Sequence, residues 1–391
     1  MIKSIFLLTI LHAALSLPAP GVISTWAFRE NVTWKYSHCS SFVRLPSDVI
    51  LAVFQASQST EGASTQEKFL VRSTDGGATF SPPSVLVANT TGDLLPWDGT
   101  MFIDTTGRVR YVYAGGDKFH IPAGPLFTIS STDEGISWSA PTLVVPISVW
   151  NRSMSNINPP VRLRDGTLAL PVDTVPGVSS ENGPVTSGLI VVGGDGELWS
   201  PLGFVPSPEL AQISTFLEPA VAKCPPPLDN QLLMLLRTNI GQLWASRSTD
   251  SGATWSTAYE TPFRNPDSKV NLFQWSGPSA GGNAPRDGDF VLLLNPNAEW
   301  GPKGCNATQP YCARTPLSLT VSRDCGGSWG SLYDIEIDAN DHWGFGYPTA
   351  QQCNSSAVTG ASAICLTYSV STNGTVPGGI RYSIVPATNL I

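Results

Sequence analysis

Two arginines of the sequence stand at the borders of apolar segments. Arg237 ends the run formed by residues 232–236, and Arg314 stands just before the apolar residues of 317–321. An unpaired guanidinium beside a buried segment is costly, so each arginine requires an anionic partner. That partner is either a structural carboxylate, such as Glu218 for Arg237, or the carboxylate of a bound ligand, which the planar guanidinium pairs bidentately.

Four aspartates recur in one short pattern, Ser-x-Asp-x-Gly-x-Thr/Ser-Trp/Phe. The four copies occupy residues 73–80, 131–138, 248–255 and 322–329. In a hairpin of this composition the aspartate accepts backbone N–H bonds, the glycine takes a positive φ and the aromatic residue packs between sheets. Four equivalent turns cannot all form one active site, so we interpret these aspartates as structural.

The spacing of this pattern predicts the architecture. Successive aspartates lie 58, 117 and 74 residues apart, and 117 is close to twice 58, which predicts a degenerate copy at residues 193–199. Segment 108–113 places Val109, Tyr111 and Tyr113 on one face, which is typical of a half-buried strand. Repeated sheets of about 60 residues each predict an all-β fold, a six-bladed β-propeller with four-stranded antiparallel blades. The alternative, a pair of β-sandwich domains, explains the period poorly.

Composition narrows the class of protein further. The 391 residues include 36 glycines and 33 prolines, are 13% charged and 41% apolar, and carry a net charge of −8. So many helix breakers exclude a helical bundle, and the apolar content excludes a disordered chain. An acidic chain without runs of lysine or arginine lacks the electrostatic footprint of a protein that binds nucleic acid or anionic membranes. We expect one propeller domain over residues 17–391, monomeric and without a cofactor.

The N-terminus predicts secretion. Lys3 precedes an apolar run over residues 5–17, and small residues at 14–16 offer a cleavage site, so residues 1–16 are expected to be a signal peptide. That run is too short to span a bilayer, and no later segment is long and apolar enough to do so. Six Asn-x-Ser/Thr sequons fit the secretory route, at Asn31, Asn89, Asn151, Asn306, Asn354 and Asn373.

Seven cysteines agree with an oxidising compartment. Two pairs are close enough in sequence for local disulfides, Cys305 with Cys312 and Cys353 with Cys365. The other three cannot all pair with one another, so at least one thiol stays free; they are Cys39, Cys224 and Cys325. No two cysteines have the Cys-x-x-Cys spacing of a metal site, and we expect no metal ion.

The repeated pattern resembles the Asp-box, or bacterial neuraminidase repeat, of the sialidase superfamily, whose members are six-bladed propellers. The resemblance extends from about Tyr36 to Val385. It implies a propeller fold and carbohydrate ligands. Asp-boxes also occur in other propellers, so the scattered positions that the family uses for catalysis are the more specific comparison.

Four of those positions are filled. Glu218-Pro219 and the strand that ends at Arg237 resemble the family pattern E-P-x-x-x-E-L-x-D-G-x-L-x-x-x-x-R. Arg314 precedes the last Asp-box as a family arginine does, and Tyr347 lies in the Tyr-Ser/Pro step that follows it. The resemblance implies that Tyr347 is the nucleophile, that Glu218 is its partner, and that Arg237 and Arg314 are two of three arginines that clamp the substrate.

Two positions depart from the family. Aligning residues 44–45 with the end of the opening motif F-R-I-P-A-L-V-R-L puts His38 in the place of the third arginine. The family's acid/base aspartate lies ahead of the first Asp-box, where this chain offers Glu61 and Glu67 instead. Asp98 is a further acidic side chain available to bind substrate or supply a proton. Because His38 carries a pH-dependent charge, we expect the clamp to weaken above about pH 6.5; otherwise His38 binds a hydroxyl or acts as acid or base on another sugar.

The implied chemistry suits these side chains. A sialic acid has a carboxylate on its anomeric carbon, and a neutral phenol approaches it without the repulsion that a carboxylate nucleophile meets. A phenol with the ordinary pKa of about 10 needs a base in contact, the role implied for Glu218. We therefore predict a secreted sialidase-type exo-glycosidase that removes a terminal acidic sugar from glycoconjugates. The alternatives are a hydrolase or lyase of another sugar, such as arabinan or a uronate, and a non-catalytic carbohydrate-binding propeller.

Overall fold

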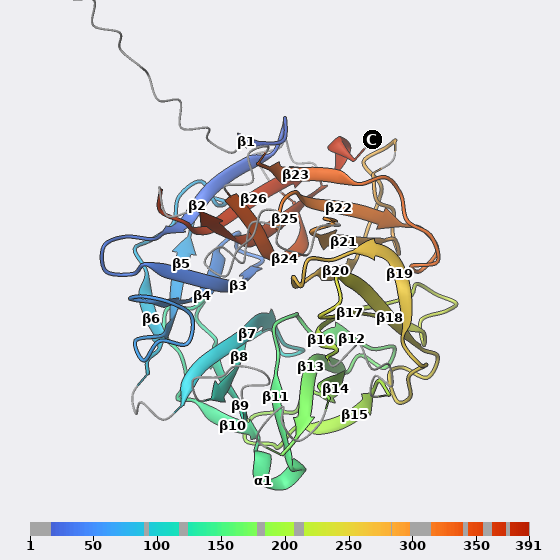
Figure 1. The fold of residues 1–391 in the computed structure, drawn as a ribbon, viewed down its shortest axis with the longest axis horizontal. Helices are drawn as coiled ribbons and strands as arrows, with labels where there is room; N and C mark the ends of the chain where they lie inside the picture. Colours follow the sequence, from blue (N-terminus) through green and yellow to red (C-terminus); the bar gives the residue numbers. More distant parts are fainter. Residues whose placement is uncertain are drawn as a thin grey trace, which may run out of the picture.

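Segments of alternating apolar residues form antiparallel sheets in the computed structural model. It describes residues 17–89, 94–116, 124–177, 184–206, 215–282, 284–297, 314–338, 343–354, 362–372 and 376–390. The sheets are six blades arranged around a central axis (Figure 1), each with four antiparallel strands and two with a short additional strand. The predicted six-bladed β-propeller is confirmed, and the alternative of two β-sandwich domains is excluded.

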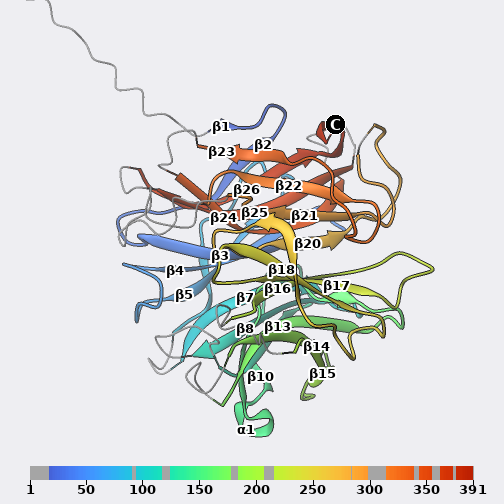
Figure 2. The same ribbon diagram turned by 45° about the vertical axis from the view of Figure 1, so that its right-hand side comes forward.

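The first three blades run outward from the axis in chain order. The first contains β3 (Tyr36–Arg44), β4 (Ile50–Ser57), β5 (Glu67–Ser73) and β6 (Ser84–Val87). The second contains β7 (Leu95–Ile103), β8 (Val109–Gly116), β9 (Leu126–Ser131) and β10 (Thr142–Val145). The third has a divided inner strand, and its strands are β11 (Arg152–Ser155), β12 (Val161–Arg162), β13 (Leu168–Pro176), β14 (Thr186–Val191) and β15 (Ser200–Phe204). The short helix α1 (Ile147–Trp150) connects the second and third blades and protrudes at the rim (Figure 2).

The other three blades complete the ring. The fourth contains β16 (Leu217–Lys223), β17 (Leu232–Arg237), β18 (Gln242–Ser248) and β19 (Tyr259–Arg264). The fifth contains β20 (Asn271–Gln274), β21 (Phe290–Leu294), β22 (Leu317–Ser322) and β23 (Tyr333–Ile337), with β1 (Leu17–Pro18) at its outer edge. The sixth contains β24 (Trp343–Asn354), β25 (Ser362–Thr372), β26 (Gly379–Pro386) and β2 (Ile23–Arg29), and the 3-10 turn η3 (Ala387–Asn389) follows β26.

Strand β2 closes the ring, because it supplies the outer strand of a blade whose other strands come from the C-terminal part of the chain. It pairs with β26 in antiparallel register, from Ile23 opposite Ile384 to Arg29 opposite Gly379. The sheet hydrogen bonds thereby join segments that are about as far apart in the sequence as this chain allows. A ring that closes in this way has no open edge between its first and last blades.

The apolar core lies between neighbouring blades. Six large clusters of buried side chains each join two adjacent blades, one at every blade interface. Trp97 of the second blade and Trp199 of the third belong to one such cluster, and both are almost fully buried. Packing between blades therefore holds the inner strands at fixed distances from the axis.

The Asp-box pattern forms the turn between the third and fourth strands of its blade. Gly77 N–H donates to Ser73 Oγ (2.9 Å), while Thr79 N–H and Oγ donate to the two oxygens of Asp75 (2.9 and 2.5 Å). The other three copies make the same bonds. Hydrogen bonds from the hydroxyl and amide of Thr79 lower the pKa of Asp75 to about 2. The aspartates stabilise turns, as predicted, and the degenerate copy at 193–199 lies at the equivalent place between β14 and β15.

The pairing of the described cysteines agrees with the prediction from their number and spacing. Cys353 pairs with Cys365 inside the sixth blade, and Cys224 pairs with Cys325 across the interface between the fourth and fifth blades. Among the described residues Cys39 is the free cysteine. Segment 1–16, the cysteines 305 and 312, and the sequons at 306 and 373 lie outside the described residues. Within the part of the chain that the structure describes, none of the helices has the length and apolar character needed to cross a bilayer.

Candidate active site at the propeller axis

Four inner strands carry the same irregularity where they approach the axis (Figure 1). In β3, β7, β16 and β24, two residues oppose a single residue of the next strand, so each strand contains a bulge. The first residue of each bulge has a left-handed backbone: Cys39 (φ 52°), Asp98 (43°), Glu218 (48°) and Tyr347 (59°). A bulge bends its strand and redirects the side chain at that position. Four blades thereby direct four chemically active side chains toward one place.

Tyr347 and Glu218 are in direct contact. Tyr347 Oη donates a hydrogen bond of 2.7 Å to Glu218 Oε1. Burial raises the pKa of the Tyr347 phenol well above its usual value, and the negative charge of Glu218 adds to this, while Arg237 and Arg314 oppose it. The resting phenol is therefore neutral and has a carboxylate positioned to accept its proton.

Arg237 binds both members of this pair. Its Nη1 donates to Tyr347 Oη (2.5 Å) and lies 2.7 Å from Glu218 Oε2, and its Nε donates to Asp267 Oδ1 (2.6 Å). The structural ion pair considered for Arg237 and Glu218 is thus present in the resting protein. Glu218 takes Nη1 of the guanidinium and Asp267 takes Nε, while Nη2 takes no part in these contacts.

Arg314 lies over the face of the nucleophile candidate. Its guanidinium carbon is 4.9 Å from the centre of the Tyr347 ring, and its Nη2 donates to the backbone oxygen of Asp267 (2.9 Å). Gly346 permits this approach, because a Cβ there would lie 2.8 Å from Arg314 Cδ. Both arginines predicted to clamp a substrate therefore lie at the axis, anchored to one acidic residue.

His38 lies against Tyr347 as its alignment with a clamp position implied. The two ring centres are 4.1 Å apart, and His38 Nδ1 is 2.8 Å from Ser369 Oγ. Burial lowers the pKa of His38 well below 6.5, and the charges of Arg314 and Arg237 lower it further. The imidazole is therefore neutral at neutral pH. The expected weakening of the clamp above about pH 6.5, based on loss of a charge from His38, is wrong for this reason.

Glu61 reaches the same place through a chain of polar contacts in the first blade. His38, Gln55 and Lys68 are paired in register across β3, β4 and β5. Lys68 Nζ donates to Gln55 Oε1 (2.9 Å), and Gln55 Nε2 donates to Glu61 Oε1 (2.8 Å). Glu61 is partly exposed, and its carboxylate lies within 4.8 Å of the ligand atoms of His38 and Cys39. This carboxylate is partly exposed and held close to His38 and Cys39.

Glu67 is placed differently. It precedes Lys68 in β5, and adjacent residues of a strand point to opposite faces of the sheet. Since Lys68 faces Gln55, Glu67 lies on the other face of the blade. The contacts that gather Glu61 at the axis do not include Glu67, so the two glutamates predicted as alternatives are separated by the sheet.

Asp98 joins the group from the second blade. Its Oδ1 accepts a 3.7 Å contact from Cys39 Sγ, and its backbone oxygen accepts a hydrogen bond from Tyr111 Oη (2.9 Å). Burial, and then the charge of Glu218, raise the pKa of Asp98 to about 7. A carboxyl group with this pKa near the axis is suited to exchanging a proton at neutral pH.

Two buried charged residues near the site, Lys269 and Asp173, were not predicted from the sequence. Lys269 is fully buried and donates to Pro348 O and to Thr349 Oγ (3.1 Å), and burial lowers its pKa to about 7. Asp173 accepts a hydrogen bond from Ser155 Oγ (3.1 Å), and burial and the charge of Asp98 raise its pKa well above 3.8. A lone charged residue inside an otherwise apolar strand, as at Asp173 in β13, was the available signal.

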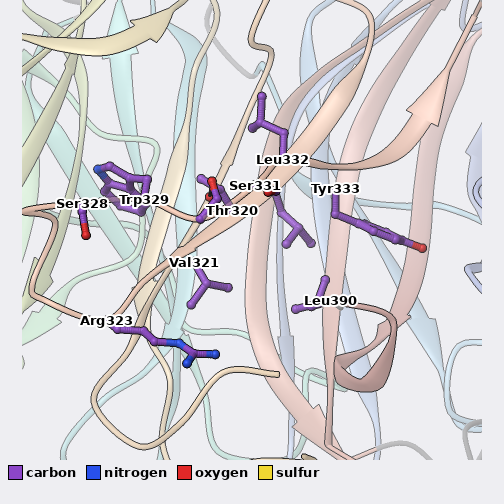
Figure 3. A pocket seen from close by; sticks show the side chains of 11 residues that line it. Thr320, Val321, Arg323, Ser328, Trp329, Ser331, Leu332, Tyr333 and Leu390 are labelled. Atoms are coloured by element: carbon purple, nitrogen blue, oxygen red, sulfur yellow. Dashed lines mark hydrogen bonds between the residues drawn. The ribbon is translucent and has the colours of Figure 1, made fainter. Parts of the chain in front are cut away.

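A hollow of about 400 Å³ lies elsewhere, at the fifth blade (Figure 3). Its lining includes Arg323, Trp329, Tyr333 and Leu390, and the lining residues contain no carboxylate, histidine or cysteine. It therefore lacks an acid and a base for catalysis. Among the described residues, the chemically complete group is the one at the axis.

Fold and site together define a sialidase-like propeller. A family model described as a BNR repeat-like domain matches residues 94–359, and the chain belongs to that family. A search of curated protein sequences finds none that matches the chain.

Solved structures with similar folds include sialidases. A Dyadobacter fermentans protein of unknown function has a TM-score of 0.65 at 16% identity, over 94% of this chain and 100% of that one. Trypanosoma rangeli sialidase has a TM-score of 0.67 at 15% identity, over 94% of this chain and 60% of that one. NanB sialidase from Streptococcus pneumoniae has a TM-score of 0.65 at 12% identity, over 94% of this chain and 71% of that one. Identities this low establish the fold alone, and the chain spans only part of the length of these sialidases.

Proposed function

We propose that this protein is a secreted exo-glycosidase of the sialidase type that hydrolyses the bond to a terminal acidic sugar. The observation that carries the proposal is the hydrogen bond between Tyr347 Oη and Glu218 Oε1, with Arg237 and Arg314 beside it. A phenol paired with a buried carboxylate is the arrangement that an activated tyrosine nucleophile requires. Secretion is supported by the composition of residues 1–16.

In the first step Tyr347 Oη attacks the anomeric carbon while Glu218 accepts the phenol proton. The bond to the leaving oxygen breaks, and Glu61 in its protonated form supplies the proton that this oxygen needs. In the second step Glu61 takes a proton from water, which attacks the same carbon and displaces Tyr347. The phenolate recovers its proton from Glu218, and every group returns to its starting state.

The cations at the axis favour an acidic sugar. Arg237 and Arg314 offer two permanent charges, whereas the neutral ring of His38 contributes a hydrogen bond and no charge. A carboxylate on the sugar meets two guanidinium groups, and the imidazole is suited to a hydroxyl or to the second carboxylate oxygen. We therefore expect weaker carboxylate binding than three arginines would give, with hydrogen bonding at His38 contributing to selectivity.

The direct test measures sugar release by the full chain. Fluorogenic sialosides and β-glucuronides are incubated with wild type, Tyr347→Phe and Glu218→Gln. Tyr113→Phe is a matched control, since Tyr113 packs against Phe127 between strands of the second blade. We expect release by wild type and the control, with loss in the two site variants. Equal release by wild type and Tyr347→Phe would refute the nucleophile.

Two other outcomes point to the alternative functions. Release of arabinose oligomers or an unsaturated uronate from polysaccharide, with sialosides untouched, would indicate another sugar specificity. Retention on immobilised glycans without release of any product would indicate a binding propeller.

A further inference from the structure

The proposed glycosidase reaction does not use the buried thiol of Cys39. Cys39 is 2% exposed and is the first residue of the bulge in β3, the position that Asp98, Glu218 and Tyr347 occupy in their own blades. It belongs to one buried cluster with Ile157 and Tyr347, and it is the free cysteine among the described residues. A thiol held at the centre of the propeller between a histidine and carboxylates requires an explanation of its own.

We propose that His38, Cys39 and Glu61 form a binding site for a single Zn²⁺ ion. Their ligand atoms, a ring nitrogen, a sulfur and a carboxylate oxygen, all lie within 4.8 Å of one another. Zinc bonds of about 2.0–2.3 Å in tetrahedral geometry put ligand atoms roughly 3.3–3.8 Å apart. Small side-chain adjustments therefore suffice to close the site around an ion.

Hydrogen bonds to neighbouring side chains already orient two of the three proposed ligands, His38 and Glu61. His38 Nδ1 is 2.8 Å from Ser369 Oγ, which fixes the orientation of the ring, and Gln55 Nε2 donates to Glu61 Oε1 at 2.8 Å. Contacts of this kind fix the ring and carboxylate orientation in protein metal sites. Glu61 is partly exposed and belongs to the turn between β4 and β5, so it is the ligand that closes onto the ion.

Charges of both signs surround the proposed ligands. Carboxylates of Asp98, Glu61 and Glu218 act on the sulfur in the sense that favours a bound cation, and Lys68 acts in the opposite sense. The positive charges of Arg314, Arg237 and Lys269 act on His38 in that opposite sense as well. Asp98 Oδ1 is 3.7 Å from Cys39 Sγ, so either this carboxylate or a water molecule would be the fourth ligand. A thiolate with an imidazole selects zinc over magnesium or calcium, which prefer oxygen ligands only. Binding releases the thiol proton to solvent, and no electron is transferred.

The effect of zinc on activity rests on the proposed glycosidase function. An ion bound by Glu61 withdraws the carboxylate that protonates the leaving oxygen. Zinc is therefore expected to inhibit the glycosidase reversibly, and a chelator to restore it. The site would make activity depend on the free zinc concentration around the protein.

The test measures metal binding without reference to activity. Full-length protein treated with EDTA and desalted is titrated with zinc chloride by calorimetry, and with cobalt chloride while the thiolate-to-metal charge-transfer absorption is recorded. We expect one ion per chain and a cobalt–thiolate band in wild type. Cys39→Ser should remove the band and weaken zinc binding at least tenfold, and Glu61→Gln should weaken binding while retaining the band. Glu67→Gln, on the opposite face of the blade, is the matched control and should bind zinc as wild type does.

Either of two results overturns the proposal: wild type binds no zinc, or Cys39→Ser binds it with unchanged affinity. If Cys39→Ser fails to fold, the cobalt titration of wild type still tests the proposal. A wild-type protein that shows no cobalt–thiolate absorption would also contradict the proposed site. The two proposals fail separately. Zinc binding without sugar release leaves the metal site standing, and sugar release without zinc binding removes the metal site alone.

Discussion

Glu218 and Tyr347 occupy the same structural position in two different blades, and their oxygens meet at 2.7 Å. Each is the first residue of a bulge in the inner strand, with φ of 48° and 59°. A left-handed backbone is uncommon for residues other than glycine and is tolerated here because pairing with the next strand of the blade fixes each bulge. The proposed nucleophile and its proposed base are therefore positioned by the sheets themselves.

Removing the base should slow the first chemical step. We expect Glu218→Gln to lower kcat by about 10²–10⁴-fold, since the phenol of Tyr347 then has no group to accept its proton. Tyr347→Phe should lower it at least as much, and the double variant should be no slower than the more damaged single one, because the two side chains act as a unit. Steady-state kinetics on a fluorogenic substrate check this. Additive losses would contradict it.

The loss of activity caused by Glu61→Gln should be larger for a substrate with a poorer leaving group. A protonated Glu61 assists an alkoxide leaving group, whereas a nitrophenolate leaves without help. We expect Glu61→Gln to lower hydrolysis of a natural oligosaccharide at least tenfold more than hydrolysis of a nitrophenyl glycoside. Equal losses on both substrates would assign the proton to Asp98, whose pKa is raised to about 7.

His38 should not titrate in the range expected for an ordinary histidine. Burial, and then the charges of Arg314 and Arg237, lower its pKa well below 6.5, so the ring is neutral from about pH 6.5 upward. The ring proton signals of His38 in NMR spectra, assigned with a His38→Gln variant, should not shift over this range. A midpoint near pH 6.5 would contradict the buried, neutral ring.

Asp98 should make stability depend on pH. Its pKa in the folded protein is about 7, raised from 3.8, so between about pH 4 and 7 the unfolded chain has lost a proton that the folded chain keeps. The free energy of unfolding therefore falls as pH rises through this range and levels off above it. We expect Asp98→Asn to gain stability relative to wild type from pH 4 to 7. Urea unfolding at several pH values measures the difference, and a constant difference would exclude this linkage.

The disulfide between the fourth and fifth blades should stabilise the ring. Cys224 and Cys325 close a loop with a sequence separation of 101, against 12 for Cys353 and Cys365. Longer closed loops restrict the unfolded chain more, so Cys224→Ala with Cys325→Ala should lower the free energy of unfolding by about 2–4 kcal/mol. The corresponding Cys353→Ala, Cys365→Ala variant should lose less. Denaturant unfolding compares the two, and a larger loss in the second variant would contradict the loop-length explanation.

The propeller was predictable because its signals are local and repeated. Asp75 and its three equivalents mark the same hairpin in four blades, and the period alone gave the blade number. Tyr347, Glu218, Arg237 and Arg314 were found through resemblance, and the structure brings them into contact.

The rest of the site depends on strand register, which single segments do not encode. The bulges at Cys39 and Asp98 arise from pairing with β4 and β8, and a one-residue shift would turn these side chains to another face. The contact of Lys68 with Gln55 likewise comes from the register of β4 against β5. For the same reason, the neutral state of His38 was missed, since its cationic neighbours come from distant blades.

The pairing of β2 with β26 also has a consequence for how the molecule is made. Residues 23–29 emerge from the ribosome well before their partner strand, residues 379–386. At typical rates of synthesis the first segment waits on the order of tens of seconds with an unsatisfied strand edge. The sixth blade therefore cannot be completed until residues 379–386 are available, and a premature stop before residue 379 leaves a protein whose ring cannot be completed.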